Sequence, residues 1–246
     1  MALGVLAALV LNSGRELSAA RLASLIWDEP PPSAMSNLRT HVGRARLWLR
    51  QHDLVHRLPT TRGAGEGSTT YRLIVQPGEC DVQVFQDRIA YARTTLAHGR
   101  LDDAMDLFRQ GLSMWEGPAC SNVSGSAILR ASLDHLDEQG LLAWEDYIEV
   151  GLRLGMERFL VREIRGLVTE HPTREGISGQ LIRALYLSGD PHGALNEYER
   201  LRRLLREELG VDPSSSLQDL YRTVLRHDDQ AIRAPGDLRR SLGHTA

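Results

Sequence analysis

The chain has 246 residues, of which 42% are hydrophobic and 25% are charged, and its net charge is −3. This length and composition fit a globular protein of one large domain or two ordinary ones. Two isolated cysteines exclude a disulfide framework and a zinc cluster. No apolar run approaches the ~20 residues of a membrane-spanning helix, and the apolar start lacks the features of a signal peptide. We therefore expect a cytoplasmic protein without a membrane partner.

The charge is unevenly distributed along the chain. All 29 basic residues are Arg, which stays charged and can bind phosphate through two hydrogen bonds. Residues 1–78 carry nine Arg and five acids, a balance of +4, whereas the remainder carries 20 Arg and 27 acids, a balance of −7. A basic first third on an acidic body is typical of a nucleic-acid-binding head on a scaffold that does not bind nucleic acid. Ordinary surface variation is the alternative explanation.

Three helices are predicted in the first 51 residues. Residues 2–11 are apolar on nearly all sides, so this helix should be buried on most of its surface. Ser18 can cap a second helix over 19–27, and Ser33, after three prolines, can cap a third helix that ends near Gln51. The apolar positions of the third helix recur at helical spacing and should face the core: Met35, Leu38, Val42, Ala45 and Leu49.

Two strands should follow these helices. Residues 55–61 and 69–75 read as the strands of a hairpin, joined by a tip rich in Gly, Ser and Glu. Residues 76–79, with the sequence QPGE, close this part of the chain. The predicted first domain is therefore residues 1–78.

From Asp81 onward the pattern is helical and contains an internal repeat. Gly99, Gly155 and Gly189 are each followed by core-type side chains five and nine positions later. The 34 residues from Gly155 to Gly189 match the tetratricopeptide period. We expect a second, tetratricopeptide-like domain over residues 79–226. Residues 227–246 have no apolar period, and we expect a mobile tail there.

Helix–turn–helix followed by a hairpin is the order of a winged helix, whose third helix enters the major groove of DNA. Asn37, Thr40, Arg44 and Arg46 would then contact bases or phosphates. Arg44 can donate two hydrogen bonds to guanine, and Thr40 can offer its methyl group to thymine. The alternative is an ordinary solvated helix face with arginines.

The whole arrangement resembles the SARP family of antibiotic-pathway activators, which join an OmpR-like winged helix to a bacterial transcriptional activation domain. The segments that carry the resemblance are 22–27, NLRTHVGRARLWL at 37–49, Tyr71-Arg72-Leu73, 184–193 and EELGVDP at 207–213. Two features depart from the family. Its members usually begin with a small antiparallel sheet ahead of the first helix, whereas Met1 of this chain lies at that helix. Residues 63–68 also make the wing of this chain longer than usual.

The resemblance implies a mainly α fold and a pathway-specific transcriptional activator of antibiotic biosynthesis. Such a protein binds repeats in double-stranded promoter DNA and recruits the RNA polymerase holoenzyme, and direct repeats leave room for a homodimer. The positions that match the family's DNA contacts are Asn37, Arg39, Thr40, Arg44 and Arg46 in the third helix, with Arg62, Thr69 and Thr70 in the wing.

Other functions leave little trace in the sequence. The nine His are scattered without metal-ligand spacing, and no phosphate-binding loop or nucleophile motif is present. We therefore expect no enzyme, no cofactor and no metal. Two alternatives stay open: a tetratricopeptide-type adaptor whose degenerate head does not bind DNA, and a small-molecule sensor that uses the concave helical surface.

Overall fold

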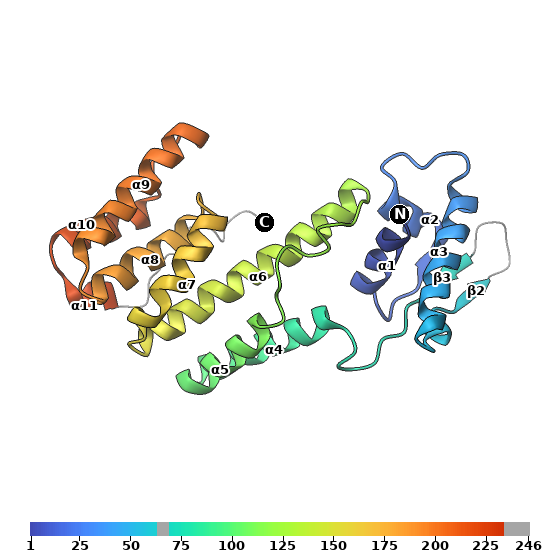
Figure 1. The fold of residues 1–246 in the computed structure, drawn as a ribbon, viewed down its shortest axis with the longest axis horizontal. Helices are drawn as coiled ribbons and strands as arrows, with labels where there is room; N and C mark the ends of the chain where they lie inside the picture. Colours follow the sequence, from blue (N-terminus) through green and yellow to red (C-terminus); the bar gives the residue numbers. More distant parts are fainter. Residues whose placement is uncertain (63–68, 234–246) are drawn as a thin grey trace. The chain divides into compact units, whose positions relative to one another are not determined.

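The computed structural model describes residues 1–62 and 69–233 (Figure 1). By contacts the chain divides into two compact units. Unit 1 consists of Met1–Arg88 and Gly111–Leu141, and unit 2 consists of Ile89–Gln110 and Leu142–Ala246. The described part is mainly helical, as the sequence predicts, with one small sheet in unit 1.

The first three helices of unit 1 form as expected. Helix α1 spans Ala2–Leu11, α2 spans Ala19–Ile26 and α3 spans Ala34–Gln51. Ser18 caps α2, since its side chain accepts a hydrogen bond from the amide of Arg21. Leu38, Val42, Ala45 and Leu49 of α3 are buried against α1 and α2. Met35 is exposed, contrary to the prediction, because Ala34, four residues before Leu38, fills the first turn of that face.

The sheet of unit 1 has three short antiparallel strands in the order β1-β3-β2. Strand β2 (Thr60–Arg62) and strand β3 (Thr69–Tyr71) form the wing, and β1 (Leu17–Ser18) pairs with the other edge of β3. The prediction of a strand over 55–61 is wrong at its start, because Val55–Arg57 forms the 3-10 helix η1. The amide of Leu54 closes a turn on the carbonyl of Leu49, and that turn leads directly into η1. The longer wing tip expected at 63–68 lies outside the described residues.

The apolar helix α1 is covered by chain from beyond the predicted first domain. Helix α4 (Asp81–Ala97) starts in unit 1, and helix α6 (Ala127–Arg153) belongs to unit 1 up to Leu141. Leu129 and Leu133 of α6 lie in one core cluster with Val5 and Leu9 of α1. The boundary expected after residue 78 therefore does not coincide with a break in the packing of unit 1.

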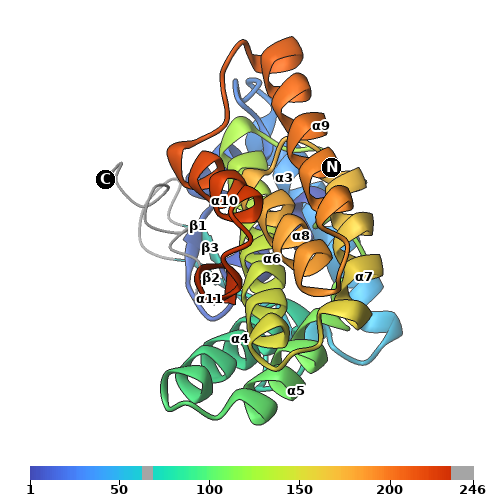
Figure 2. The ribbon, with the colours of Figure 1, turned by 90° about the vertical axis from the view of Figure 1, so that its left-hand side faces the viewer.

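Unit 2 stacks antiparallel helices in the manner of tetratricopeptide repeats. It holds most of α5 (Leu101–Leu112), followed by α7 (Glu157–Glu170), α8 (Glu175–Leu187) and α9 (Pro191–Leu209). Helix α8 packs against both α7 and α9 and lies between them (Figures 1 and 2). Helix α10 (Ser215–Leu225) follows and packs on α9.

The repeat predicted from the glycines has a clear structural basis. Gly99, Gly155 and Gly189 have φ values of 76°, 73° and 93°, a left-handed backbone that glycine adopts without steric cost. Each of them lies between two helices of the stack. The residues five and nine positions later are all buried: Ala104, Phe108, Leu160, Ile164, Ala194 and Tyr198.

The end of the described chain is more ordered than the sequence predicts. Helix α11 (Asp229–Arg233) lies within the expected tail, and its Ile232 side chain is buried. The buried guanidinium of Arg183 on α8 donates a hydrogen bond of 3.1 Å to the carbonyl of Ile232. The sequence does not predict this helix, because Ile232 is a single apolar residue in a polar segment and its hydrogen bond to Arg183 depends on tertiary packing. The rest of the expected tail, 234–246, lies outside the described residues.

Candidate nucleic-acid interface

The polar face of α3 is the candidate surface for reading DNA. Asn37, Thr40 and Arg44 are exposed there, opposite the residues that face the core, and Arg39 is exposed on the flank of the helix. The Asn37 amide donates to the Ser33 hydroxyl at 3.1 Å, and the Thr40 hydroxyl donates to the Ser36 carbonyl at 3.2 Å. These local bonds orient two short polar side chains and leave their remaining donors and acceptors open to a ligand.

Arg46 is placed differently from the other arginines of α3. It is half-buried, and its Nε and Nη2 atoms donate to the Leu58 carbonyl at 3.0 and 2.8 Å. Nη2 also contacts the Thr60 hydroxyl. Arg46 thus joins α3 to the base of the wing, an arrangement that sequence spacing alone does not reveal. Its remaining N–H donors are available for a phosphate contact.

The three wing candidates lie together on the sheet. Arg62 on β2 pairs in register with Thr69 on β3, and Thr70 is opposite Thr61. Arg62 is exposed and the two threonines are half-buried. The structure therefore brings Arg62 and Thr69 side by side at the start of the wing tip.

His41 lies on the same side of α3 as Asn37, Thr40 and Arg44, as its spacing in the sequence indicates, although it is not among the predicted contacts. Its ring is 6.3 Å from that of Trp27, and its Nδ1 atom is buried without a hydrogen-bond partner among the described residues. Burial lowers the pKa of His41, and the positive charges of the chain's amino terminus and of Arg44 lower it further. This imidazole is consequently held neutral in a face that otherwise carries guanidinium groups.

The described residues form neither a metal site nor a membrane-spanning helix. No group of His, Cys, Asp or Glu within the described ranges could hold a metal ion. None of the helices at 1–62 and 69–233 is long and apolar enough to cross a bilayer.

A winged helix-turn-helix joined to tetratricopeptide-like helices is the architecture of a bacterial transcriptional regulator. The model of the Bacterial transcriptional activator domain family matches residues 80–225. The chain belongs to the SARP family of regulators that carry this domain.

Named relatives align with nearly the whole chain. Regulatory protein DnrI of Streptomyces peucetius is 31% identical, over 91% of this chain and 83% of its own length. Regulatory protein AfsR of Streptomyces griseus is 34% identical, over 95% of this chain and 23% of its own length. The chain thus spans about a quarter of the length of the AfsR relatives.

A solved structure shares the fold. Mycobacterium tuberculosis EmbR, in complex with a low affinity phosphopeptide, superposes with a TM-score of 0.79 at 26% identity. The match covers 98% of this chain and 64% of that chain. The same connection of winged helix and stacked helices therefore occurs in a named transcriptional regulator.

Proposed function

We propose that this protein is a cytoplasmic transcriptional activator that binds double-stranded promoter DNA through α3 and the wing. The observation that carries the proposal is the exposed face of α3, where Thr40 and Arg44 lie opposite a buried apolar face and Arg39 lies on the flank. The wing is tied to the same helix through Arg46. Major-groove reading by a helix, with a hairpin beside it, needs this arrangement.

The charge balance of the two parts of the chain is the basis for assigning DNA contacts to one and polymerase contacts to the other. Residues 1–78 carry the positive balance, and we assign base and phosphate contacts to them, with Asn37, Arg46, Arg62, Thr69 and Thr70 as further contacts. The acidic remainder, residues 79–226, is assigned to contact with the RNA polymerase holoenzyme. By its family the protein would act on genes of antibiotic biosynthesis, as a homodimer on direct repeats.

DNA binding is tested by fluorescence anisotropy on the full chain, with duplexes from the upstream regions of the neighbouring genes. Arg44→Ala should weaken specific binding about tenfold or more, since one lost bidentate base contact costs roughly 1–3 kcal/mol. The log–log salt dependence should become shallower by about one unit if Arg44 instead meets a phosphate. Arg222→Ala is the matched control, because Arg222 is exposed and paired with Asp219 in unit 2. Equal losses in both variants would contradict the assignment.

Activation needs a second measurement. Transcription from the bound promoter by reconstituted polymerase holoenzyme should depend on the intact body as well as on α3. We expect Ala194→Arg to abolish activation, because Ala194 is fully buried and an unpaired charge there is costly. Full transcription by the Ala194→Arg variant would instead favour an adaptor or sensor role for the body.

A further inference from the structure

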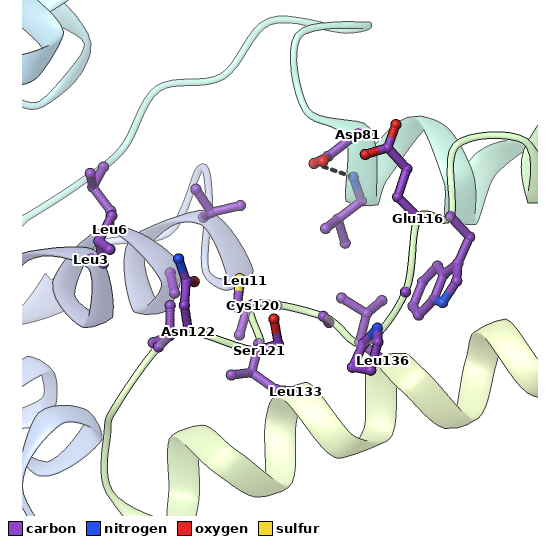
Figure 3. Close-up of a pocket in the computed structure, with 18 of the residues that line it drawn as sticks. Leu3, Leu6, Leu11, Asp81, Glu116, Cys120, Ser121, Asn122, Leu133 and Leu136 are labelled. Atoms are coloured by element: carbon purple, nitrogen blue, oxygen red, sulfur yellow. Dashed lines mark hydrogen bonds between the residues drawn. The ribbon is translucent and has the colours of Figure 1, made fainter. Parts of the chain in front are cut away.

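A pocket of about 740 Å³ opens inside unit 1 beside α1. Its walls come from α1, the first turn of α4, residues 114–123 and the first half of α6 (Figure 3). Pockets of this size hold drug-sized molecules. The function proposed above makes no use of it.

Most of the pocket surface is apolar and includes aromatic rings. Leu3 and Leu6 of α1 line one side (Figure 3). The Trp115 ring is fixed by Phe85, with ring centres 5.1 Å apart, and by Gly140 behind it. Trp48, which is half exposed, contributes from α3. Such walls favour a ligand with an apolar body, and the tryptophan faces also attract cations.

The charged groups of the lining are all acidic. Asp81 of α4 and Glu116 of the segment 114–123 both line the pocket, and Figure 3 draws them on the side away from the α1 leucines. One Asp81 oxygen accepts the Val82 amide at 2.8 Å, and the structure records no partner for Glu116 among the described residues. No Arg lines the described pocket, although the chain has 29. The charged side chains of the lining therefore favour a cation over an anion.

Cys120 lies in the same pocket and interacts electrostatically with one of its two carboxylates. Its thiol lines the pocket, and its backbone has a φ of 50°, an uncommon conformation for a residue with a side chain. Burial raises the pKa of the Cys120 thiol, and the charges of Asp81 and Asp137 raise it further. Of these causes, only the carboxylate charges distinguish the sign of a ligand, and they favour a cation.

We propose that this pocket is a binding site for a drug-sized hydrophobic organic cation. The apolar body of the ligand packs on the α1 leucines and on Trp115, and its ammonium group faces Asp81 and Glu116. Because Trp48 belongs to α3, the ligand also touches the helix that carries Arg44. The site does not depend on DNA binding, so its test is separate from that of the proposed function.

The test uses three probes that share one aromatic body: pyrenylmethylammonium, pyrenylmethanol and pyrenylacetate. Their binding to the full chain is followed by pyrene anisotropy and by energy transfer from tryptophan. We expect the cation to bind about tenfold more tightly than the acetate, with the alcohol between them, because two nearby carboxylates discriminate by charge. Failure of all three to bind, or equal affinities, would overturn the proposal.

Substitution of the two lining carboxylates tests whether the cation binds in this pocket. In the double variant Asp81→Asn with Glu116→Gln, the preference for the cation over the alcohol should fall to within about twofold. Glu29→Gln, which removes an exposed acid outside the lining, should leave the preference unchanged. Persistence of the full preference in the double variant would place the cation elsewhere and overturn the proposal.

A second pair of variants decides the case if the double variant does not fold. Leu3 is 55% exposed at the pocket, so both Leu3→Arg and Leu3→Glu should be tolerated. The arginine should weaken binding of the cation several-fold, and the glutamate should preserve or strengthen it. The same effect from both substitutions would show that charge does not govern this pocket.

Discussion

Arg46 and Arg44 are two residues apart on α3, yet only Arg46 is hydrogen-bonded to the base of the wing. Arg46 satisfies the carbonyl of Leu58, a residue that is almost fully buried, whereas Arg44 is exposed. We expect Arg46→Ala to destabilise the wing by about 1–3 kcal/mol, because a polar group loses its partner there. The measurement is amide hydrogen exchange at Ile74, whose N–H bonds the Arg57 carbonyl beside the wing.

Arg44→Ala is the control for this experiment, and it should leave the exchange of Ile74 unchanged while weakening DNA binding. Arg46→Lys should fall between wild type and Arg46→Ala, since an ammonium group can supply one of the two bonds to Leu58. Wild-type exchange in Arg46→Ala would show that Arg46 does not hold the wing.

His41 predicts a pH dependence whose sign is fixed by its environment. Its pKa in the folded protein is lowered from the ordinary 6.5, so the unfolded chain binds more protons near and below that value. The contribution of His41 to stability is therefore full above pH 6.5 and is lost as the pH falls towards the folded pKa. The measurement is the melting temperature of wild type and of His41→Gln as a function of pH. The difference between the two curves gives the contribution of His41 to stability.

DNA should reverse the effect, because nearby phosphates raise the pKa of His41. Promoter affinity of the wild type should then rise more steeply with falling pH than that of His41→Gln. The exposed His135, elsewhere in unit 1, provides the control His135→Gln. Identical pH profiles for wild type and His41→Gln would place His41 away from the DNA.

At the scale of elements, the stacked helices depend on turns that need a left-handed residue. Gly189 has a φ of 93° between α8 and α9, whereas Gly166 lies exposed in the interior of α7 with open space around it. Gly189→Ala should destabilise unit 2 by about 1–2 kcal/mol. Gly166→Ala should stabilise it by about 0.5–1 kcal/mol, because alanine is the better helix former. Urea unfolding followed by circular dichroism measures both, and changes of the same sign would contradict this account of the turns.

The sequence predicts elements where local chemistry and long-range packing agree. The cap at Ser18 and the spacing of the apolar positions in α3 predict helices α2 and α3 to within a residue or two. Ser33 occupies the N-cap position of α3, but its side chain makes no capping hydrogen bond there. Strand β1, with two residues, carries no periodic signal and exists only because β3 offers an edge. The contact of Arg46 with Leu58 and the pocket beside α1 arise from tertiary packing, which spacing along the chain does not encode.

At the scale of the whole molecule, the apolar helix α1 makes the winged helix dependent on later chain. Val5, Ala8 and Leu9 are buried in a cluster that includes Leu129 and Leu133 of α6. A backbone hydrogen bond also connects the segment before α6 to the end of α2, because the amide of Ser126 donates to the Leu25 carbonyl at 3.2 Å. Residues 1–78 alone would expose the surface that these α6 leucines cover.

We therefore expect the fragment 1–78 to associate and to bind the dye anilinonaphthalene sulfonate, since each uncovered leucine forgoes roughly 1.5–3 kcal/mol. Adding the fragment 79–225 should restore a monomeric winged helix and remove the dye. In the full chain, Leu129→Ala should cost about 2–5 kcal/mol, because Leu129 is almost completely buried. Ile128→Ala, at an exposed neighbouring position, should cost much less. A soluble, monomeric fragment 1–78 with a sharp melting transition would show that α1 needs no cover from α6.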